Sequence, residues 1–169
     1  MSYNTLLCIV AMTELLPAGV SESYVDKVIP TYQERLGTCI EVANAAEIWG
    51  DGAIKPSQAV SIAYQETAFD GRLIGRAGER GPMQVLPAYT SKECKREGNR
   101  CDWVREGIKA LLYWTRRFPR TPLCHYNGGN RCGKQARSYA RAVRRRQHRI
   151  ASQIKALSFD FENASSLAP

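Results

Sequence analysis

The fold expected for this chain is decided by one apolar stretch, Pro56-Ser57-Gln58-Ala59-Val60-Ser61-Ile62-Ala63-Tyr64-Gln65, which Glu66 follows. Its apolar residues have the spacing of a helix, and Pro56 suits a first helical turn, where its missing N–H costs no hydrogen bond. We therefore predict a helix that begins at Pro56 and carries Glu66 near its end. Burial would raise the pKa of this carboxyl group and let it donate a proton near neutral pH. A salt-bridged glutamate at a helix end is the simpler interpretation of the spacing alone.

Helical patterns on both sides of this stretch predict an all-α fold. Apolar residues recur at helical spacing from Cys39 to Trp49, before Gly50, and again from Val104 to Thr115. A final, basic helix is indicated by the apolar residues between Tyr139 and Leu157. Strand patterns are few, so the class is all-α.

The remaining segments are divided by glycine, proline and polar residues. We predict a loop over residues 70–82, a short helix over 84–91, a turn-like segment over 94–101 and a turn over 126–130. The chain divides into an N-terminal helical extension, residues 1–37, and a main domain, residues 38–160.

Size and charge limit the class of protein. A chain of 169 residues suits one domain with its own core, and a hydrophobic fraction of 44% argues against disorder. The net charge of +8 suits an acidic partner such as a cell wall, an anionic membrane surface or nucleic acid, although a solvated helix face is the simpler interpretation. No apolar run reaches the ~20 residues that a transmembrane helix needs. The apolar start, Leu6 to Met12, fits an amphipathic helix better than a secretion signal.

The even number of cysteines favours three disulfides, although six cysteines allow 15 connectivities. The preferred set pairs the cysteines that are close in sequence, Cys94 with Cys101 and Cys124 with Cys132, which leaves Cys8 for Cys39. Disulfides would imply an oxidising compartment outside the cytoplasm. A zinc site that uses Cys124 and His125 is the alternative, but the C-x-x-C spacing of structural zinc sites is absent. We expect no metal and no cofactor.

Three motifs follow one another along the chain: Glu66-Thr67-Ala68-Phe69-Asp70, then Gly78-Glu79-Arg80-Gly81-Pro82-Met83-Gln84-Val85-Leu86-Pro87, then His125-Tyr126-Asn127-Gly128-Gly129. Together they resemble the soluble lytic transglycosylase family, whose pattern is E-S-x-F, G-A-x-G-L-M-Q-x-x-P and A-Y-N-x-G. The similarity covers roughly residues 38–146, and three ordered motifs are specific where one alone is weak. The resemblance implies a lysozyme-like, α-rich fold and an enzyme that cleaves peptidoglycan.

The resemblance also implies roles for individual residues. Glu66 matches the family's single catalytic acid and base. It would protonate the glycosidic oxygen between N-acetylmuramic acid and N-acetylglucosamine, and then draw a proton from the muramyl C6 hydroxyl to give a 1,6-anhydromuramyl end. The residues that would bind the substrate are Thr67, Met83, Gln84, Tyr126, Asn127 and Tyr139.

The chain departs from the family pattern in its loop. Gly75 stands where many members have Ser, and Glu79 adds a second carboxylate. Glu79 or Asp70 as a second acid would support hydrolysis, as in the related goose-type lysozymes, but Leu86 stands where those relatives often carry Asp. The simpler roles for both carboxylates are surface ion pairs with Arg72, Arg76 or Arg80.

We expect the partner to be peptidoglycan glycan strands, with no nucleic acid, and the protein to be a monomer. The implied location is the periplasm or the cell exterior at the bacterial wall, where a phage lysin or a virion-associated enzyme would also act. The basic C-terminal helix would hold the protein to an anionic wall or membrane surface. Two rival classes are a wall-binding protein without catalysis and a nucleic-acid binder that uses Arg141 to Arg149.

Overall fold

The computed structural model describes residues 1–13 and 30–166. No strand is present among these residues, so the fold is all-α, as predicted. The α-helices are α1 (Tyr3–Thr13), α3 (Tyr32–Trp49), α4 (Pro56–Thr67), α5 (Lys92–Glu97), α6 (Trp103–Arg117), α7 (Pro122–Gly128) and α8 (Lys134–Ser166). Two 3-10 helices, η1 (Pro87–Tyr89) and η2 (Gly98–Arg100), flank α5.

Local sequence signals set the ends of these helices. At the start of α3, the Thr31 hydroxyl accepts the Glu34 N–H and the Glu34 carboxylate accepts the Thr31 N–H, which is a capping box. Helix α4 begins at Pro56 and α3 ends before Gly50, as predicted. The Asp102 carboxylate accepts a backbone N–H from the first turn of α6.

One hydrophobic core joins α1, α3, α4, α6 and α8. Each of these helices contributes at least one fully buried side chain, namely Leu7, Val42, Ile62, Ile108 and Val143. Helix α1 therefore shares its core with the main domain, and the expected boundary after residue 37 lies inside α3. Residues 14–29 of the expected extension lie outside the described part of the chain.

The three predicted disulfides are confirmed: Cys8–Cys39, Cys94–Cys101 and Cys124–Cys132. The first ties α1 to α3, the second spans α5 and η2, and the third closes the loop between α7 and α8. Disulfides persist in oxidising compartments, so the protein fits such an environment.

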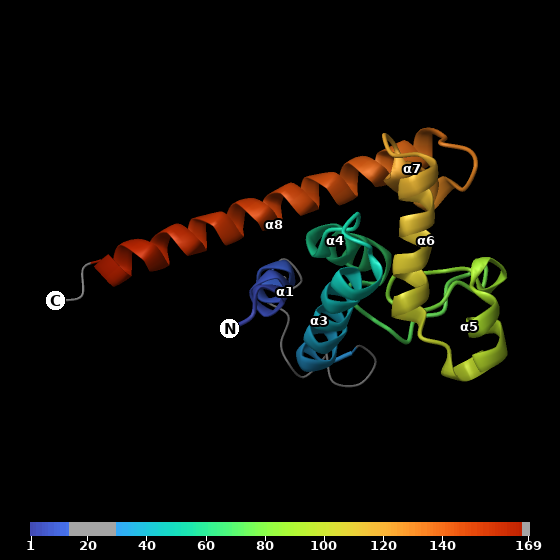
Figure 1. Ribbon diagram of the computed structural model, residues 1–169, viewed down its shortest axis with the longest axis horizontal. Helices are drawn as coiled ribbons and strands as arrows, with labels where there is room; N and C mark the ends of the chain where they lie inside the picture. Colours follow the sequence, from blue (N-terminus) through green and yellow to red (C-terminus); the bar gives the residue numbers. More distant parts are fainter. Residues whose placement is uncertain (14–29, 167–169) are drawn as a thin grey trace.

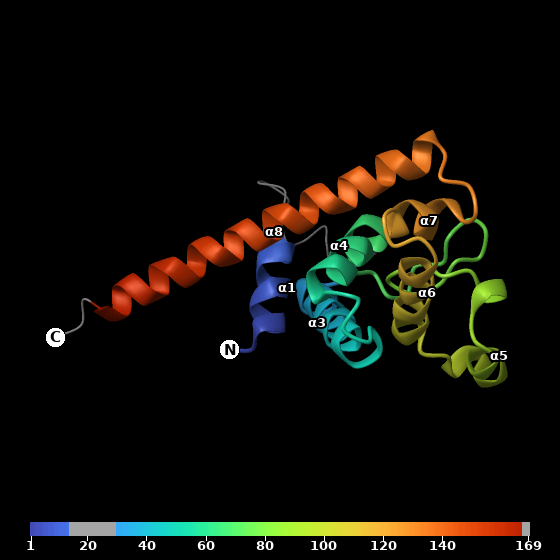
Figure 2. The same cartoon turned by 45° about the horizontal axis from the view of Figure 1, so that its top comes forward.

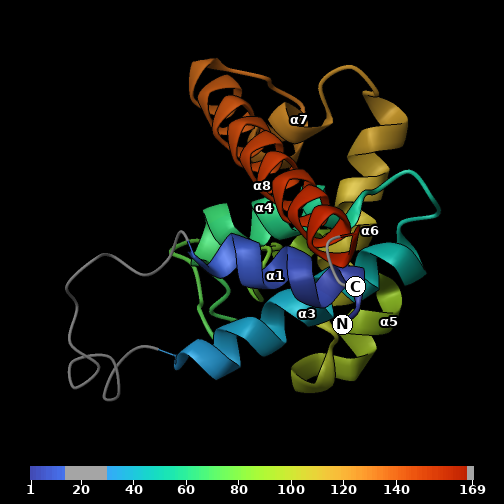
Figure 3. The same ribbon diagram turned by 90° about the vertical axis from the view of Figure 1, so that its left-hand side faces the viewer.

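Helix α8 is the longest element and lies across α7, α4 and α1 before it continues past the body of the molecule (Figure 1, Figure 2). Its 33 residues span roughly 50 Å at the α-helical rise of ~1.5 Å per residue. Val143 and Ile150 on its inner face are fully buried, whereas nearly all side chains from Ala151 to Leu157 are exposed. Figure 3 shows α8 crossing over α1 and α4. No helix in the described part of the chain is both long and apolar enough to cross a membrane.

Three local predictions are wrong. Of residues 94–101, predicted to be turn-like, all but Cys101 lie in α5 and η2, and residues 126–128, predicted to form part of a turn, lie in α7. Residues 84–91, predicted to be a helix, contain only the three-residue η1. A helix of six or seven residues is too short to show an apolar period, so the sequence pattern cannot distinguish it from a turn.

Candidate active site

Glu66 lies in the last turn of α4, beside a sharp change of chain direction. Ala68 and Phe69 follow with φ angles of 50° and 67°, a left-handed region that non-glycine residues rarely adopt. The bend is held from two sides. Phe69 is fully buried and packs edge-on against Tyr64, and the Arg35 guanidinium donates to the Ala68 carbonyl. The carboxyl group is thus attached to a backbone that packing fixes in place.

The loop from Gly81 to Gln84 lies against the end of α4. The Thr67 hydroxyl donates to the Pro82 carbonyl at 3.0 Å, which joins the helix to the loop. Gly81 has a φ of 74°, and a Cβ there would collide with the first residue of α6, so glycine is required. Gln84 is also left-handed, with a φ of 52°, and its side-chain amide donates to two loop carbonyls at 3.0 and 3.1 Å. These bonds fix the orientation of the Gln84 side chain.

Met83 connects this loop to two helices. Its side chain is fully buried against Gly107 of α6, where an added Cβ would lie 2.8 Å from both the Cβ and the Sδ of Met83. Its carbonyl accepts the Tyr126 hydroxyl of α7 at 2.7 Å. The loop therefore depends on the close approach of α6 and on the position of Tyr126.

Tyr126 of α7 and Tyr139 of α8 act electrostatically on the Glu66 carboxyl group. Burial raises the pKa of both hydroxyls well above the ordinary value, and the Glu66 carboxyl raises it further, so both are neutral. The Tyr139 hydroxyl is buried, and its contact with Glu66 falls short of full hydrogen-bond geometry. The two groups are still close enough for each to shift the pKa of the other.

The pKa of Glu66 itself is raised. Burial is the main cause, the Tyr139 hydroxyl opposes it by stabilising the charged form, and the Glu79 carboxylate adds a smaller increase. The upward effects prevail, so Glu66 holds its proton to a higher pH than an exposed glutamate does. A general acid that works near neutral pH needs this property.

A cleft of about 890 Å³ opens at Glu66, within the range of ~300–1,000 Å³ that is typical of ligand sites. Its walls come from the loop after α4, the segment around η1 and helices α6 and α7. Aromatic side chains line it beside polar ones, a combination that suits a ligand with both apolar faces and hydroxyls. The aromatic members are Tyr89, Tyr113, Trp114 and Tyr126.

Four of the predicted site residues line this cleft: Glu66, Gln84, Tyr126 and Asn127. Thr67 and Met83 do not line it. Both side chains are buried behind the wall, where they hold the loop in place. Tyr139 also lies outside the lining and reaches the Glu66 carboxyl from α8. The predicted residues therefore gather around one place, but three of them act from beneath its surface.

The two additional carboxylates of the sequence have different surroundings. Glu79 lines the cleft and accepts a backbone N–H of its own loop at 3.0 Å. A Cβ at Gly75 would collide with the Glu79 carboxylate and lie 2.6 Å from Oε1 of Gln84, so a larger residue there would require both side chains to turn aside. Asp70 instead forms an ion pair with Arg72 at 3.8 Å, as the simpler interpretation predicted.

Sequence reasoning missed Glu106, a buried carboxylate of α6 that also lines the cleft. It accepts the N–H and the hydroxyl of Ser91 at 2.7 and 2.9 Å and forms an ion pair with Lys109 at 3.4 Å. Burial alone would raise the pKa of Glu106, but Ser91 and Lys109 lower it more, so the group is ionised near neutral pH. Glu106 lies off the apolar stripe of α6, and only the segment packed over it buries it. The sequence therefore held no signal for this residue.

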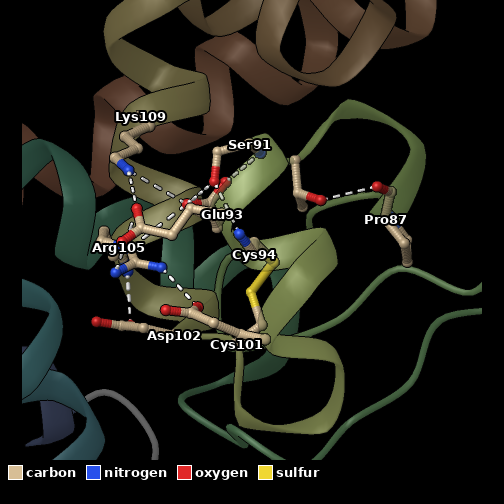
Figure 4. The surroundings of a disulfide bond; sticks show 11 residues. Pro87, Ser91, Glu93, Cys94, Cys101, Asp102, Arg105 and Lys109 are labelled. Atoms are coloured by element: carbon tan, nitrogen blue, oxygen red, sulfur yellow. Dashed lines mark hydrogen bonds and ion pairs between the residues drawn. A yellow bond between two sulfur atoms is a disulfide. The ribbon is translucent and has the colours of Figure 1, made fainter.

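Glu106 belongs to a network of ion pairs that holds α5 to α6. Arg105 pairs with Glu97 at 2.8 Å and with Glu93 at 3.7 Å, and Lys109 pairs with Glu93 at 3.7 Å. Figure 4 shows Arg105 and Lys109 directed toward Glu93 beside the Cys94–Cys101 disulfide. The disulfide and these pairs together fix one wall of the cleft.

The alternative zinc site is not formed. Cys124 is in a disulfide, and His125 is buried, with its ring stacked on Phe118 at a centroid distance of 3.7 Å. Within residues 1–13 and 30–166, no group of three or more His, Cys, Asp and Glu side chains is arranged to hold a metal ion.

The cleft thus combines a carboxyl group of raised pKa, the neutral hydroxyl of Tyr126 and a fixed amide, with the neutral hydroxyl of Tyr139 behind the carboxyl. This arrangement can transfer a proton to and from a bound polar ligand. Comparisons with protein-family models, with curated proteins and with solved structures find no match for this chain. Its function is therefore to be inferred from the three motifs and from the chemistry of this cleft.

Proposed function

We propose that this protein cleaves the β-1,4 bond between N-acetylmuramic acid and N-acetylglucosamine in peptidoglycan, as a lytic transglycosylase with Glu66 as general acid and base. One observation carries the proposal: the Glu66 carboxyl has a raised pKa and faces a cleft beside the neutral hydroxyl of Tyr126. The similarity of the three motifs to those of soluble lytic transglycosylases supports it.

In the first step, protonated Glu66 gives its proton to the glycosidic oxygen while the bond to muramyl C1 breaks. The N-acetylglucosamine unit leaves as an alcohol, and the new carboxylate stabilises the positive charge that develops at C1. Glu66 then accepts the proton of the muramyl C6 hydroxyl as that oxygen bonds to C1. The acid is restored and the product carries a 1,6-anhydro ring, so neither water nor a protein nucleophile is consumed.

The neighbouring side chains would position the substrate and the acid. Gln84 is held by two loop carbonyls, which leaves its side-chain carbonyl oxygen as an acceptor for a sugar hydroxyl or amide. Asn127 is exposed on α7 and offers both donor and acceptor groups at the cleft. Tyr139 would tune Glu66, because its hydroxyl favours the charged form that the second step begins from.

A second candidate, hydrolysis by a lysozyme-like mechanism, is favoured by one observation: Glu79 lines the same cleft and acts electrostatically on Glu66. In that mechanism a second carboxylate activates water or attacks C1 itself. Glu79 would have to approach the sugar from the face opposite Glu66.

Mass spectrometry of muropeptides released from purified peptidoglycan tests both candidates. We expect 1,6-anhydromuramyl ends, no release by Glu66→Gln, and unchanged products with Glu79→Gln. Glu47→Gln makes the same chemical change on the exposed side of α3 and serves as the control. Reducing ends that vanish in Glu79→Gln would instead establish hydrolysis. Lysis by Glu66→Gln would refute the role of Glu66, and a wild-type protein that binds wall without releasing muropeptides would establish the non-catalytic class.

We further propose that α8 holds the enzyme on an anionic wall or membrane surface in the periplasm or outside the cell. Eight of the 24 Lys and Arg residues lie on α8 between residues 134 and 157, where there is no Asp or Glu. The other 16 balance the 16 acidic residues, so the segment 134–157 carries a charge equal to the whole net charge of +8. Seven of the eight are exposed: Lys134, Arg137, Arg141, Arg144, Arg145, Arg149 and Lys155.

Sedimentation with isolated cell walls over a salt series tests this attachment. Attraction between exposed charges is largely screened beyond a Debye length, which is ~8 Å at physiological salt and shorter at higher salt. Binding should therefore weaken as salt rises. Replacing Arg141 and Arg145 by Gln should reduce both the binding and its salt dependence. The matched control replaces Lys92 and Arg96, exposed residues of α5, by Gln. Equal loss in both double variants would contradict a specific role for α8, and a salt-dependent shift of DNA would indicate the nucleic-acid class instead.

A further inference from the structure

A second hollow of about 470 Å³ lies on the outer side of α6, next to the cleft. Lys109, Leu112, Tyr113, Arg116 and Arg117 line it. Lys109 and Tyr113 line the cleft as well, so the two depressions meet at these side chains. A ligand bound at Glu66 that branches toward α6 would reach this hollow.

The three cations of the hollow differ in how far they are neutralised. Lys109 pairs with Glu93 and Glu106, and Arg116 pairs with Asp51. Arg117 has no carboxylate partner among the residues that the structure describes. Arg117 is thus the group of this hollow whose charge is left for a ligand.

The Arg117 side chain is positioned by aromatic rings. Its guanidinium donates to the Tyr113 hydroxyl at 3.0 Å and lies 5.9 Å from the Tyr113 ring centroid and 5.6 Å from that of Phe118. Tyr113 is 51% exposed at the junction of the two depressions. A guanidinium held in this way loses less side-chain entropy when its remaining N–H groups bind an anion.

We propose that Arg117 and Tyr113 form an anion subsite that binds a carboxylate of the peptide carried by the glycan strand. The inference rests on the proposed function, since it takes the glycan to lie in the cleft at Glu66. The peptide branches from the lactyl group of the muramyl unit and carries free carboxylates. A planar guanidinium fork matches a carboxylate with two parallel hydrogen bonds, and the Tyr113 ring offers an apolar floor beside it.

The test measures affinity for two forms of the same glycan strands. Peptide-bearing strands are compared with strands whose carboxylates have been converted to neutral methylamides, and the Glu66→Gln protein is used so that neither is cleaved. We expect acidic strands to bind about tenfold more tightly than neutral ones, the size of one charge-assisted hydrogen-bonded contact. Adding Arg117→Gln should remove this preference, and Arg117→Lys should keep part of it.

Arg96→Gln in the same background is the matched control, because it removes one exposed arginine from α5, away from the hollow. The unfolding temperature of each variant is compared with that of the parent. If Arg117→Gln does not fold, Tyr113→Phe, which removes the hydroxyl that holds Arg117, takes its place and should weaken the preference.

The subsite would be overturned if the preference for acidic strands survived Arg117→Gln. It would also be overturned if the parent Glu66→Gln protein showed no such preference. The proposed function is judged separately, by muropeptide release from peptidoglycan with the wild-type protein. If the wild-type protein releases muropeptides but Arg117→Gln leaves the strand preference unchanged, only the subsite is refuted. If the protein neither releases muropeptides nor binds the strands, both the subsite and the proposed function are refuted.

Discussion

Replacing Gly107 of α6 by alanine tests how the loop of the cleft is held. An added Cβ would lie 2.8 Å from the Cβ and the Sδ of Met83, whereas carbon atoms normally approach no closer than ~3.5 Å. The Met83 sulfur can rotate away, but its Cβ is attached to the backbone, so the loop itself must move by about 0.7 Å. Because the Met83 carbonyl accepts the Tyr126 hydroxyl, this movement reaches the cleft at Glu66.

The magnitude follows from two opposing terms. Alanine is better than glycine in a helix by roughly 0.5–1 kcal/mol, whereas overpacking of a core costs ~1–3 kcal/mol. Gly37, in α3, isolates the first term, because a Cβ there meets nothing within 4 Å. Gly37→Ala should therefore stabilise the protein, and Gly107→Ala should be less stable than it by the overpacking term of ~1–3 kcal/mol.

Thermal unfolding and muropeptide release measure the two consequences. At ~2–4 °C per kcal/mol for a chain of this length, the two variants should differ by roughly 2–12 °C in Tm. We expect Gly107→Ala to lose on the order of ten- to hundredfold in activity, since a displacement near 1 Å can cost ~100-fold. Gly37→Ala should retain full activity. A Gly107→Ala protein as stable and as active as Gly37→Ala would refute the close packing of α6 on the loop.

Three further predictions concern the acid and the disulfides. The pKa of Glu66 is higher in the folded protein than in the unfolded chain, so the fold loses stability as pH rises from the ordinary glutamate pKa through the pKa in the folded state. Glu66→Gln should therefore raise the free energy of unfolding at neutral pH but not at pH 3. Tyr139→Phe removes a group that lowers the pKa of Glu66, so the alkaline limb of the pH–rate profile should move to higher pH; a shift to lower pH would contradict this. Replacing Cys8 and Cys39 by Ala opens a loop with a sequence separation of 31 residues, and denaturant unfolding should show a loss of about 3.7 kcal/mol.

Much of the fold could be predicted because long helices leave a periodic pattern. The helices around Val42, Ile62, Ile108 and Val143 have apolar side chains at helical spacing, and each buries them in the one core. The disulfide pairing could be predicted because two pairs of cysteines are close in sequence, which left one pair. The short helices α5 and α7 could not, since six or seven residues show no period. Helix α5 depends on its Ser91 cap, and α7 depends on packing against α6 and α8.

The candidate site was predicted in part. The motifs identified the residues that surround Glu66, but they did not separate Gln84, on the cleft surface, from Met83, which is buried behind it. Glu106 was not found at all, because it lies off the apolar stripe of α6, on a side that would face solvent if no other segment covered the helix. The segment containing Ser91 covers it only in the folded chain.

The sequence by itself determined the helical class, the start of α4 at Pro56 and the choice of Glu66 as the candidate acid, and it favoured the disulfide pairs that the structure forms. These properties depend on local spacing, on proline chemistry and on the order of motifs. Only the tertiary structure decided the state of that acid. Burial raises the pKa of Glu66, Tyr139 comes to it from α8, and Glu79 faces the same cleft. A pKa is set by every group that surrounds a carboxyl in space, and here those groups come from segments that are far apart in the chain.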